Sequence, residues 1–178
     1  MTRTPMKSAI LILNLSLFAA TLSAGEPQRI LTPNPAAGEL LVGTWTLVAV
    51  DNVKPDGSRV QPYGPHPDGL LVLDAHGRYA VHIFRPGRPH FAAGDKSQGT
   101  AEENRAAVQG TNAHFGRYSV DAAAAAITFH IEHALFPNWE GTEQRRSFRL
   151  NGDQLQYTVQ TPTSGGAETA EVTWKRAG

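Results

Sequence analysis

The sequence predicts an all-β protein, a closed antiparallel up-and-down β-barrel of about eight strands with one short helix in an insertion. From Leu41 onward, short runs rich in valine, isoleucine, threonine and aromatic residues alternate with turn residues, as in antiparallel sheets. Two joins have hairpin chemistry: the turn at 74–77 ends in glycine, and Asn151-Gly152 is the strongest two-residue hairpin signal. Consecutive hairpins form a meander, and a meander of this size removes its exposed edges by closing on itself.

The strands are predicted in chain order from their apolar and β-branched content. They are Thr44–Val50, Leu70–Leu73, Arg78–Phe84, Gly116–Val120, Ala126–Ala134, Glu143–Leu150, Gln154–Gln160 and Ala170–Lys175. An insertion, Arg85 to Gly116, interrupts the meander and starts with prolines that exclude a regular strand. Within it, Thr100 to Glu103 is a capping box that predicts a helix stopping at Gly110. The insertion is either a plain connection or a lid over the barrel mouth.

The first 24 residues have the pattern of a secretory signal peptide. Arg3 and Lys7 precede an apolar run, Ala9 to Leu22, and small residues follow it. The run is shorter than the ~20 residues that a membrane-spanning helix needs. We therefore expect a periplasmic or secreted mature chain without a membrane span. Its residues 25–40 include three prolines and are predicted to form an extended segment before a barrel domain at 41–178.

Length and composition exclude several classes of protein. A chain of 178 residues has room for one domain of ordinary size. Lys+Arg and Asp+Glu are both 16, so the basic surplus of a nucleic-acid-binding protein is missing. The absence of cysteine excludes disulfides, thiol nucleophiles and thiolate metal sites. Any chemistry therefore rests on histidine, carboxylate, hydroxyl and arginine side chains, and we expect neither a cofactor nor a metal.

A polar cluster is predicted inside the barrel if one particular face of the strand 126–134 points inward. His130 and Glu132 share that face, and Phe129 lies on the opposite one. Either face can be the inner one. On the next strand, an inward Arg146 would neutralise Glu132 by a bidentate pair, and His130 would then act as donor, acceptor or general base. No third ligand completes a metal site within the strand.

Aromatic side chains supply further candidate contacts. Trp45, Tyr79 and Tyr118 fall on separate strands, where they either fill the barrel or line a pocket. Asn138 and Trp139 follow a strand and a proline, which places an amide and a large ring in a loop at the barrel mouth. The candidate ligand-binding residues are Trp45, Tyr63, Tyr79, Tyr118, His130, Glu132, Asn138, Trp139 and Arg146.

An ordered set of motifs resembles the lipocalin-like domain proteins of bacteria and fungi. Leu41-Val42-Gly43-Thr44-Trp45 is similar to the Gly-x-Trp opening of lipocalins. The other motifs lie at 62–65, 69–71, 74–77, 85–91, 100–103, 115–118, 130–132, 135–139 and 141–142. The resemblance covers about Leu41 to Trp174. It implies a closed antiparallel barrel with a central pocket, in a family mostly without assigned activity, some members of which accompany natural-product pathways.

Two functions from different classes follow. The first is an exported barrel that binds a small hydrophobic or amphipathic molecule with a polar or anionic end, anchored by Arg146 and oriented by His130 and Glu132. The alternative is a cofactor-free isomerase, cyclase or hydratase of a natural-product pathway, with His130 as general base and Glu132 as its orienter. A third interpretation is structural, with the polar cluster only bracing the barrel. The sequence does not fix the oligomeric state.

Overall fold

The computed structural model describes residues 37–163 and 167–178. The predicted signal peptide, 1–24, and most of the predicted extended segment, 25–40, lie outside the described residues. The described end of that segment is helix α1, Ala37–Leu41, so the extended prediction is wrong there. A helical turn forms because it carries Leu41 into the end of the barrel, where its side chain is fully buried.

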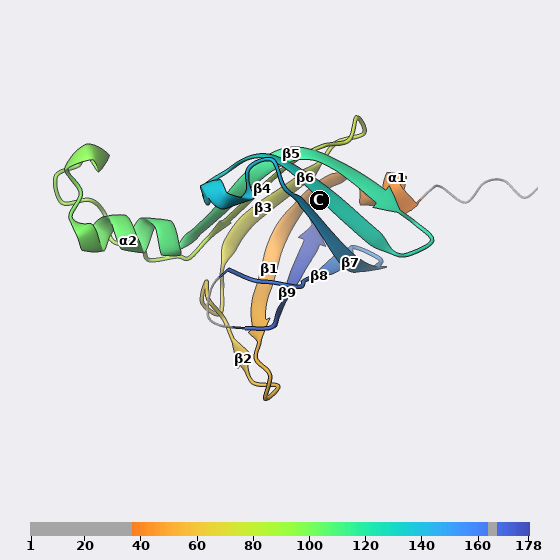
Figure 1. The fold of residues 1–178 in the computed structure, drawn as a ribbon, viewed down its shortest axis with the longest axis horizontal. Helices are drawn as coiled ribbons and strands as arrows, with labels where there is room; N and C mark the ends of the chain where they lie inside the picture. The colour runs from red at the N-terminus through yellow and green to blue at the C-terminus, as the bar shows by residue number, and fades with distance from the viewer. Residues whose placement is uncertain (1–36, 164–166) are drawn as a thin grey trace, which may run out of the picture. The chain divides into compact units, whose positions relative to one another are not determined.

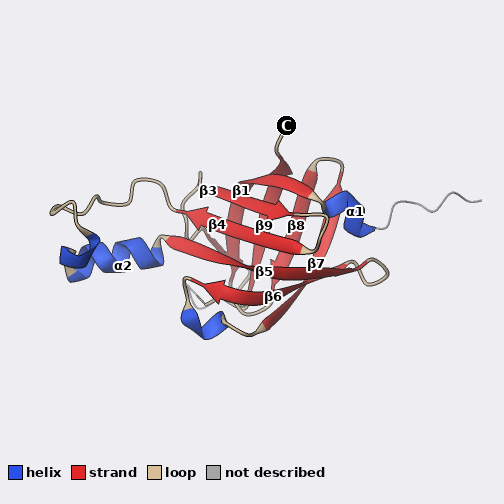
Figure 2. Ribbon diagram, turned by 90° about the horizontal axis from the view of Figure 1, so that it is seen from above, coloured by secondary structure: helices blue, strands red, loops and turns tan. Residues whose placement is uncertain are grey.

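The strands follow one another in the sheet as they do in the chain, apart from the short β2, which adds to one side of β1. They are β1 Gly43–Val53, β2 Arg59–Val60, β3 Asp68–Leu73, β4 Arg78–Phe84, β5 Thr111–Asp121, β6 Ala126–Ala134, β7 Glu143–Asn151, β8 Gln154–Val159 and β9 Thr169–Arg176. β1 pairs antiparallel with both β3 and β9, so the strands other than β2 close into a barrel (Figure 2). The predicted fold class is therefore confirmed.

The insertion between β4 and β5 projects from the barrel. It holds a 3-10 turn, η1 Lys96–Gln98, and helix α2, Ala101–Gln109, which Figures 1 and 2 both show extending beyond the ends of β4 and β5. The capping box is confirmed: Thr100 accepts a hydrogen bond from the Glu103 backbone, and the Glu103 carboxylate accepts one from the Thr100 backbone. No residue of α2 is buried, so the insertion is in the conformation of a projecting connection. No helix among the described residues is long and apolar enough to cross a membrane.

The inner faces of the strands build an apolar core toward the end of the barrel that α1 covers. Trp45 is fully buried there, and its indole N–H donates to the carbonyl oxygen of Leu41 at 3.0 Å. Arg176 lies on β9, the strand that closes the barrel, and its guanidinium carbon is 4.1 Å from the centre of the Trp45 ring. This packing closes the end of the barrel that α1 covers.

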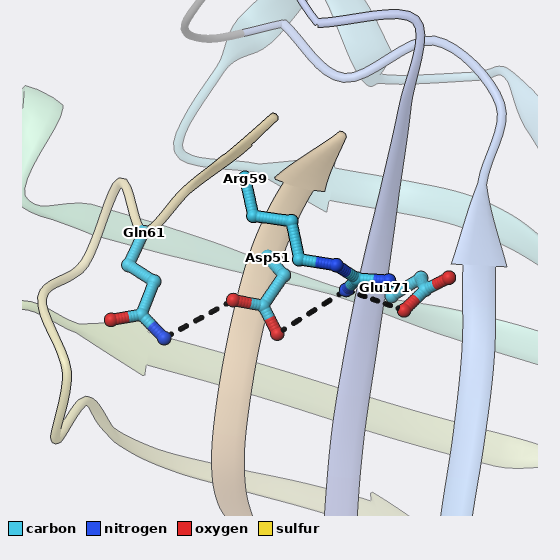
Figure 3. Close-up of polar contacts among 4 residues, drawn as sticks. All are labelled: Asp51, Arg59, Gln61 and Glu171. Atoms are coloured by element: carbon cyan, nitrogen blue, oxygen red, sulfur yellow. Dashed lines mark hydrogen bonds and ion pairs between the residues drawn. The ribbon is translucent and has the colours of Figure 1, made fainter. Parts of the chain in front are cut away.

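A group of polar contacts ties β2 to the wall at the open end (Figure 3). Arg59 donates to the Glu171 carboxylate at 2.8 Å and lies 3.7 Å from a carboxylate oxygen of Asp51. The amide of Gln61 donates to the other Asp51 oxygen at 3.1 Å. Exposed ion pairs contribute little stability each, but together these hold the segment leading to Tyr63 against β1 and β9.

We expect Gly116→Ala to lower the free energy of unfolding by about 1–3 kcal/mol, measured by urea denaturation. The pairing of β5 with β6 shifts register between Phe115 and Gly116, and a Cβ on Gly116 would lie 2.1 Å from the carbonyl oxygen of His130. Gly38→Ala is the control, because its Cβ would meet Val120 at an ordinary 3.6 Å. Equal stability of the two variants would contradict the close approach.

Candidate functional site

A cavity opens at the end of the barrel away from α1. Its walls come from β1, β4, β5, β7, β8 and β9, with Trp139 and the segment around Pro162 at the mouth. The cavity itself is small, about 50 Å³, and opens to solvent at its mouth. Val81, Ile83 and Val172 are among its apolar wall residues. The polar residues of the wall include Asn52, Tyr63, Asn112, His114, Arg146 and Tyr157. Ligand cavities are commonly built in this way, with few polar groups on an apolar wall.

Arg146 places a positive charge in this wall. It is only 5% exposed, and its guanidinium carbon lies 4.7 Å from the centre of the Phe129 ring and 4.8 Å from that of Tyr157. One Nη donates to the side-chain oxygen of Gln144 at 2.7 Å, whereas Nε is buried and finds no hydrogen-bond acceptor among the described residues. None of the ion pairs formed within 37–163 and 167–178 includes Arg146.

The surroundings of Arg146 only partly compensate for its burial. Removing a cation from water is costly unless it gains a counter-charge or hydrogen bonds. Cation–π contacts with the two rings stabilise the buried guanidinium by about 2 kcal/mol each. Burial raises the pKa of the Tyr157 hydroxyl, although Arg146 opposes that rise, so the phenol stays neutral and is no counter-ion. The guanidinium therefore has the capacity to bind an anionic or strongly accepting oxygen in the cavity.

His114 and Tyr79 form a second buried polar pair. His114, on β5, is 3% exposed, and its Nδ1 lies 2.8 Å from the Tyr79 hydroxyl on β4. Burial, with smaller contributions from Arg146 and His82, lowers the pKa of His114 well below 6.5, so the imidazole is neutral. Burial also raises the pKa of Tyr79, which stays a phenol.

The contact with Tyr79 assigns the proton of the neutral His114 ring to Nε2. If Nδ1 carried the proton instead, the Tyr79 hydroxyl would be left in the core with no acceptor for its own proton, which costs about 1–3 kcal/mol. Because Tyr79 donates to Nδ1, the N–H donor of the imidazole is Nε2. Of the two residues, His114 lines the cavity and Tyr79 does not. The ring is held by edge contacts with Tyr79, Phe129 and Trp139, at centre-to-centre distances of 5.4, 6.2 and 5.6 Å.

Comparison with known proteins places this barrel in a family. The sequence profile of the lipocalin-like domain matches residues 42–177. The chain belongs to the lipocalin-like domain family. This confirms the resemblance seen in the ordered motifs. A protein of Aspergillus oryzae named a 4'-hydroxy-3'-methoxypropiophenone carrier protein is 29% identical to the chain over 105 residues, which is 54% of this chain and 95% of that protein.

His130 and Glu132 lie on the outer face of this lipocalin-like barrel, so the condition for a polar cluster inside the barrel is not met. Phe129 and Ile131 occupy the inner face of β6 and are 0% and 2% exposed. Because successive side chains of a strand alternate between faces, His130 and Glu132 must point to solvent. The physical reason is that the Phe129 face offers much more apolar area for burial.

Both outward residues have partners on the barrel surface. Nδ1 of His130 lies 2.9 Å from the Glu143 carboxylate, and Glu132 accepts from Arg78 at 2.7 Å. The expected pair between Glu132 and Arg146 does not form, since the two side chains are on opposite faces of the sheet. The general base and orienter of the predicted enzyme therefore do not reach the cavity. No group of three or more metal-ligating side chains is found in the described parts of the chain.

The remaining predicted contacts divide between the cavity and other places. Tyr63 and Trp139 both line the cavity. Asn138 is exposed and is not part of the cavity wall. Tyr118 lies near the closed end, where its hydroxyl donates to a main-chain oxygen of the β3–β4 turn at 2.7 Å. Trp45 belongs to the core of that end, so both are structural in this lipocalin-like barrel.

Sequence reasoning missed His114 and Tyr157 as cavity residues. The signal for His114 was available: counting back by two from Tyr118 through Gly116 puts His114 on the same face. It was overlooked because the predicted strand began at Gly116, whereas β5 begins at Thr111. The five preceding residues lack apolar alternation, and pairing with β4 makes them a strand.

We expect the stability of the protein to fall below about pH 6.5 through His114. Above that pH the imidazole is neutral in both the folded and the unfolded chain. Below that pH, His114 is protonated in the unfolded chain but stays neutral in the folded chain, because folding lowers its pKa. The free energy of unfolding then falls by up to about 1.4 kcal/mol per pH unit, until the folded pKa is reached.

Urea denaturation over a pH series, with His114→Asn as the comparison, measures this contribution. The asparagine keeps an acceptor for the Tyr79 hydroxyl and has no titrating group. The wild type should lose stability relative to the variant as the pH falls below about 6.5. The same pH dependence in both proteins would contradict a neutral buried His114.

Proposed function

We propose that this protein is a carrier that holds one small, mainly apolar molecule with a polar or anionic end inside its barrel. The observation that carries the proposal is the buried guanidinium of Arg146, which has no carboxylate partner among the described residues and lines the open cavity. A ligand oxygen bound there would supply the acceptor that the fold does not. The apolar remainder of the ligand would be covered by the walls.

The aromatic residues of the cavity wall indicate which class of ligand the cavity would bind. Aromatic rings of Tyr63, Trp139 and Tyr157 line the cavity, so an aromatic ligand would find ring surfaces to pack against. The name of the Aspergillus oryzae relative describes a carrier of an aromatic ketone with a hydroxyl group on its ring. A ring hydroxyl conjugated with a ketone is acidic, and its oxygen suits a buried guanidinium. We therefore propose hydroxylated aromatic compounds as the ligand class.

Isothermal titration calorimetry with 4'-hydroxy-3'-methoxypropiophenone should show binding to the wild type and a loss of about 10- to 100-fold in affinity for Arg146→Met. The methionine keeps the side-chain volume and removes an unpaired buried charge, so the variant should fold. Arg145→Met is the matched control, because the adjacent Arg145 points outward to Asp121, at 3.0 Å. Its affinity for the ketone should equal that of the wild type.

Two outcomes would overturn this assignment of the ligand anchor. One is equal affinity of Arg146→Met and the wild type for the ketone. The other is an equal loss of affinity in Arg146→Met and Arg145→Met, which would show a general effect of positive charge. His130→Ala serves as a further control, since His130 lies on the outer face and should not affect binding.

A further inference from the structure

We propose that His114 is a second recognition residue of the cavity, which donates a hydrogen bond from Nε2 to an uncharged oxygen of the ligand. The preferred ligands are then hydroxyaryl ketones or similar flat molecules with two oxygen functions at opposite ends of an aromatic ring. The charged or acidic oxygen binds Arg146, and the carbonyl oxygen binds His114. This inference rests on the proposed carrier function and names the ligand class of the same cavity.

The two polar groups are held on different strands around one aromatic side chain. Arg146, on β7, lies over the ring of Phe129 at 4.7 Å, and the His114 ring, on β5, meets the same ring edge-to-face at 6.2 Å. Both residues line the one cavity. Because Phe129 is fully buried on β6, between those two strands, it keeps the groups at fixed positions on the wall. A single small ligand can therefore contact both groups.

The orientation of His114 is fixed before a ligand binds. The Tyr79 hydroxyl holds Nδ1 at 2.8 Å, and the edge of the ring packs against Trp139 at the mouth. Within the described residues, Nε2 has no hydrogen-bond partner. A donor that is already oriented and lacks an acceptor loses little entropy on binding a ligand oxygen.

Charge separates the roles of the two groups. Arg146 is a cation and favours an anionic or acidic oxygen, because hydrogen bonds in which the donor or acceptor is ionised are stronger than neutral ones. His114 is neutral, and protonation there is opposed by burial and by the nearby Arg146. A neutral imidazole N–H is matched by a carbonyl oxygen, which accepts a hydrogen bond and carries no full charge. Arg146 therefore suits the hydroxyl end of a hydroxyaryl ketone, and His114 suits its carbonyl end.

The test compares two probes on three proteins by isothermal titration calorimetry. One probe is 4'-hydroxy-3'-methoxypropiophenone, and the other is the same phenol with a propyl group in place of the propionyl group. The proteins are the wild type, His114→Asn and His114→Gln. Asparagine retains the partner of Tyr79 and removes the donor at Nε2, whereas the longer glutamine places an amide N–H near the position of Nε2.

We expect the affinity of His114→Asn for the ketone to be about tenfold lower than that of the wild type. Its affinity for the propyl phenol should equal that of the wild type. His114→Gln should regain most of the affinity for the ketone. An equal loss for both probes, or no loss for either, would overturn the role of His114 while leaving Arg146 as the anchor. If neither probe binds the wild type, the proposed ligand class and this inference both fail.

Discussion

The unpaired positive charge of Arg146 determines the chemistry of the barrel interior. Its contacts with Phe129 and Tyr157 and its hydrogen bond to Gln144 make its burial tolerable without neutralising it. The same charge helps to keep His114 neutral, because a second cation in the same low-dielectric space would be repelled. As far as the structure describes the chain, the cavity wall has one cation, Arg146, and its other polar groups are neutral. This arrangement is suited to holding a small acidic molecule.

Most of the fold could be predicted from the sequence because its signals are local. Alternation within each strand, the hairpin at Asn151-Gly152 and the capping box at Thr100 each depend on a few adjacent residues. The features that were missed depend on partners distant in the chain. β2 is two residues long and shows no periodicity, and the first residues of β5 form a strand only because β4 lies beside them.

The site was harder to predict, because alternation tells which side chains share a face but not which face is inward. The sequence correctly predicts that His130 and Glu132 share one face of the strand. That face points outward because the opposite face, with Phe129, buries more apolar area. Arg146 was expected inside as the partner of Glu132. It does lie inside, but without that partner. The missing counter-charge, which is the basis of the proposed function, becomes visible only when neighbouring strands are in register.

A crystal structure of the protein with 4'-hydroxy-3'-methoxypropiophenone would show directly whether Arg146 anchors the ligand. We expect the ketone inside the barrel, with its phenolic oxygen within hydrogen-bond distance of the Arg146 guanidinium. A ketone bound instead in the separate surface groove that Val108, Leu135 and Phe136 help to line, or inside the barrel with only apolar contacts to the wall, would contradict the claim that this buried charge selects the ligand.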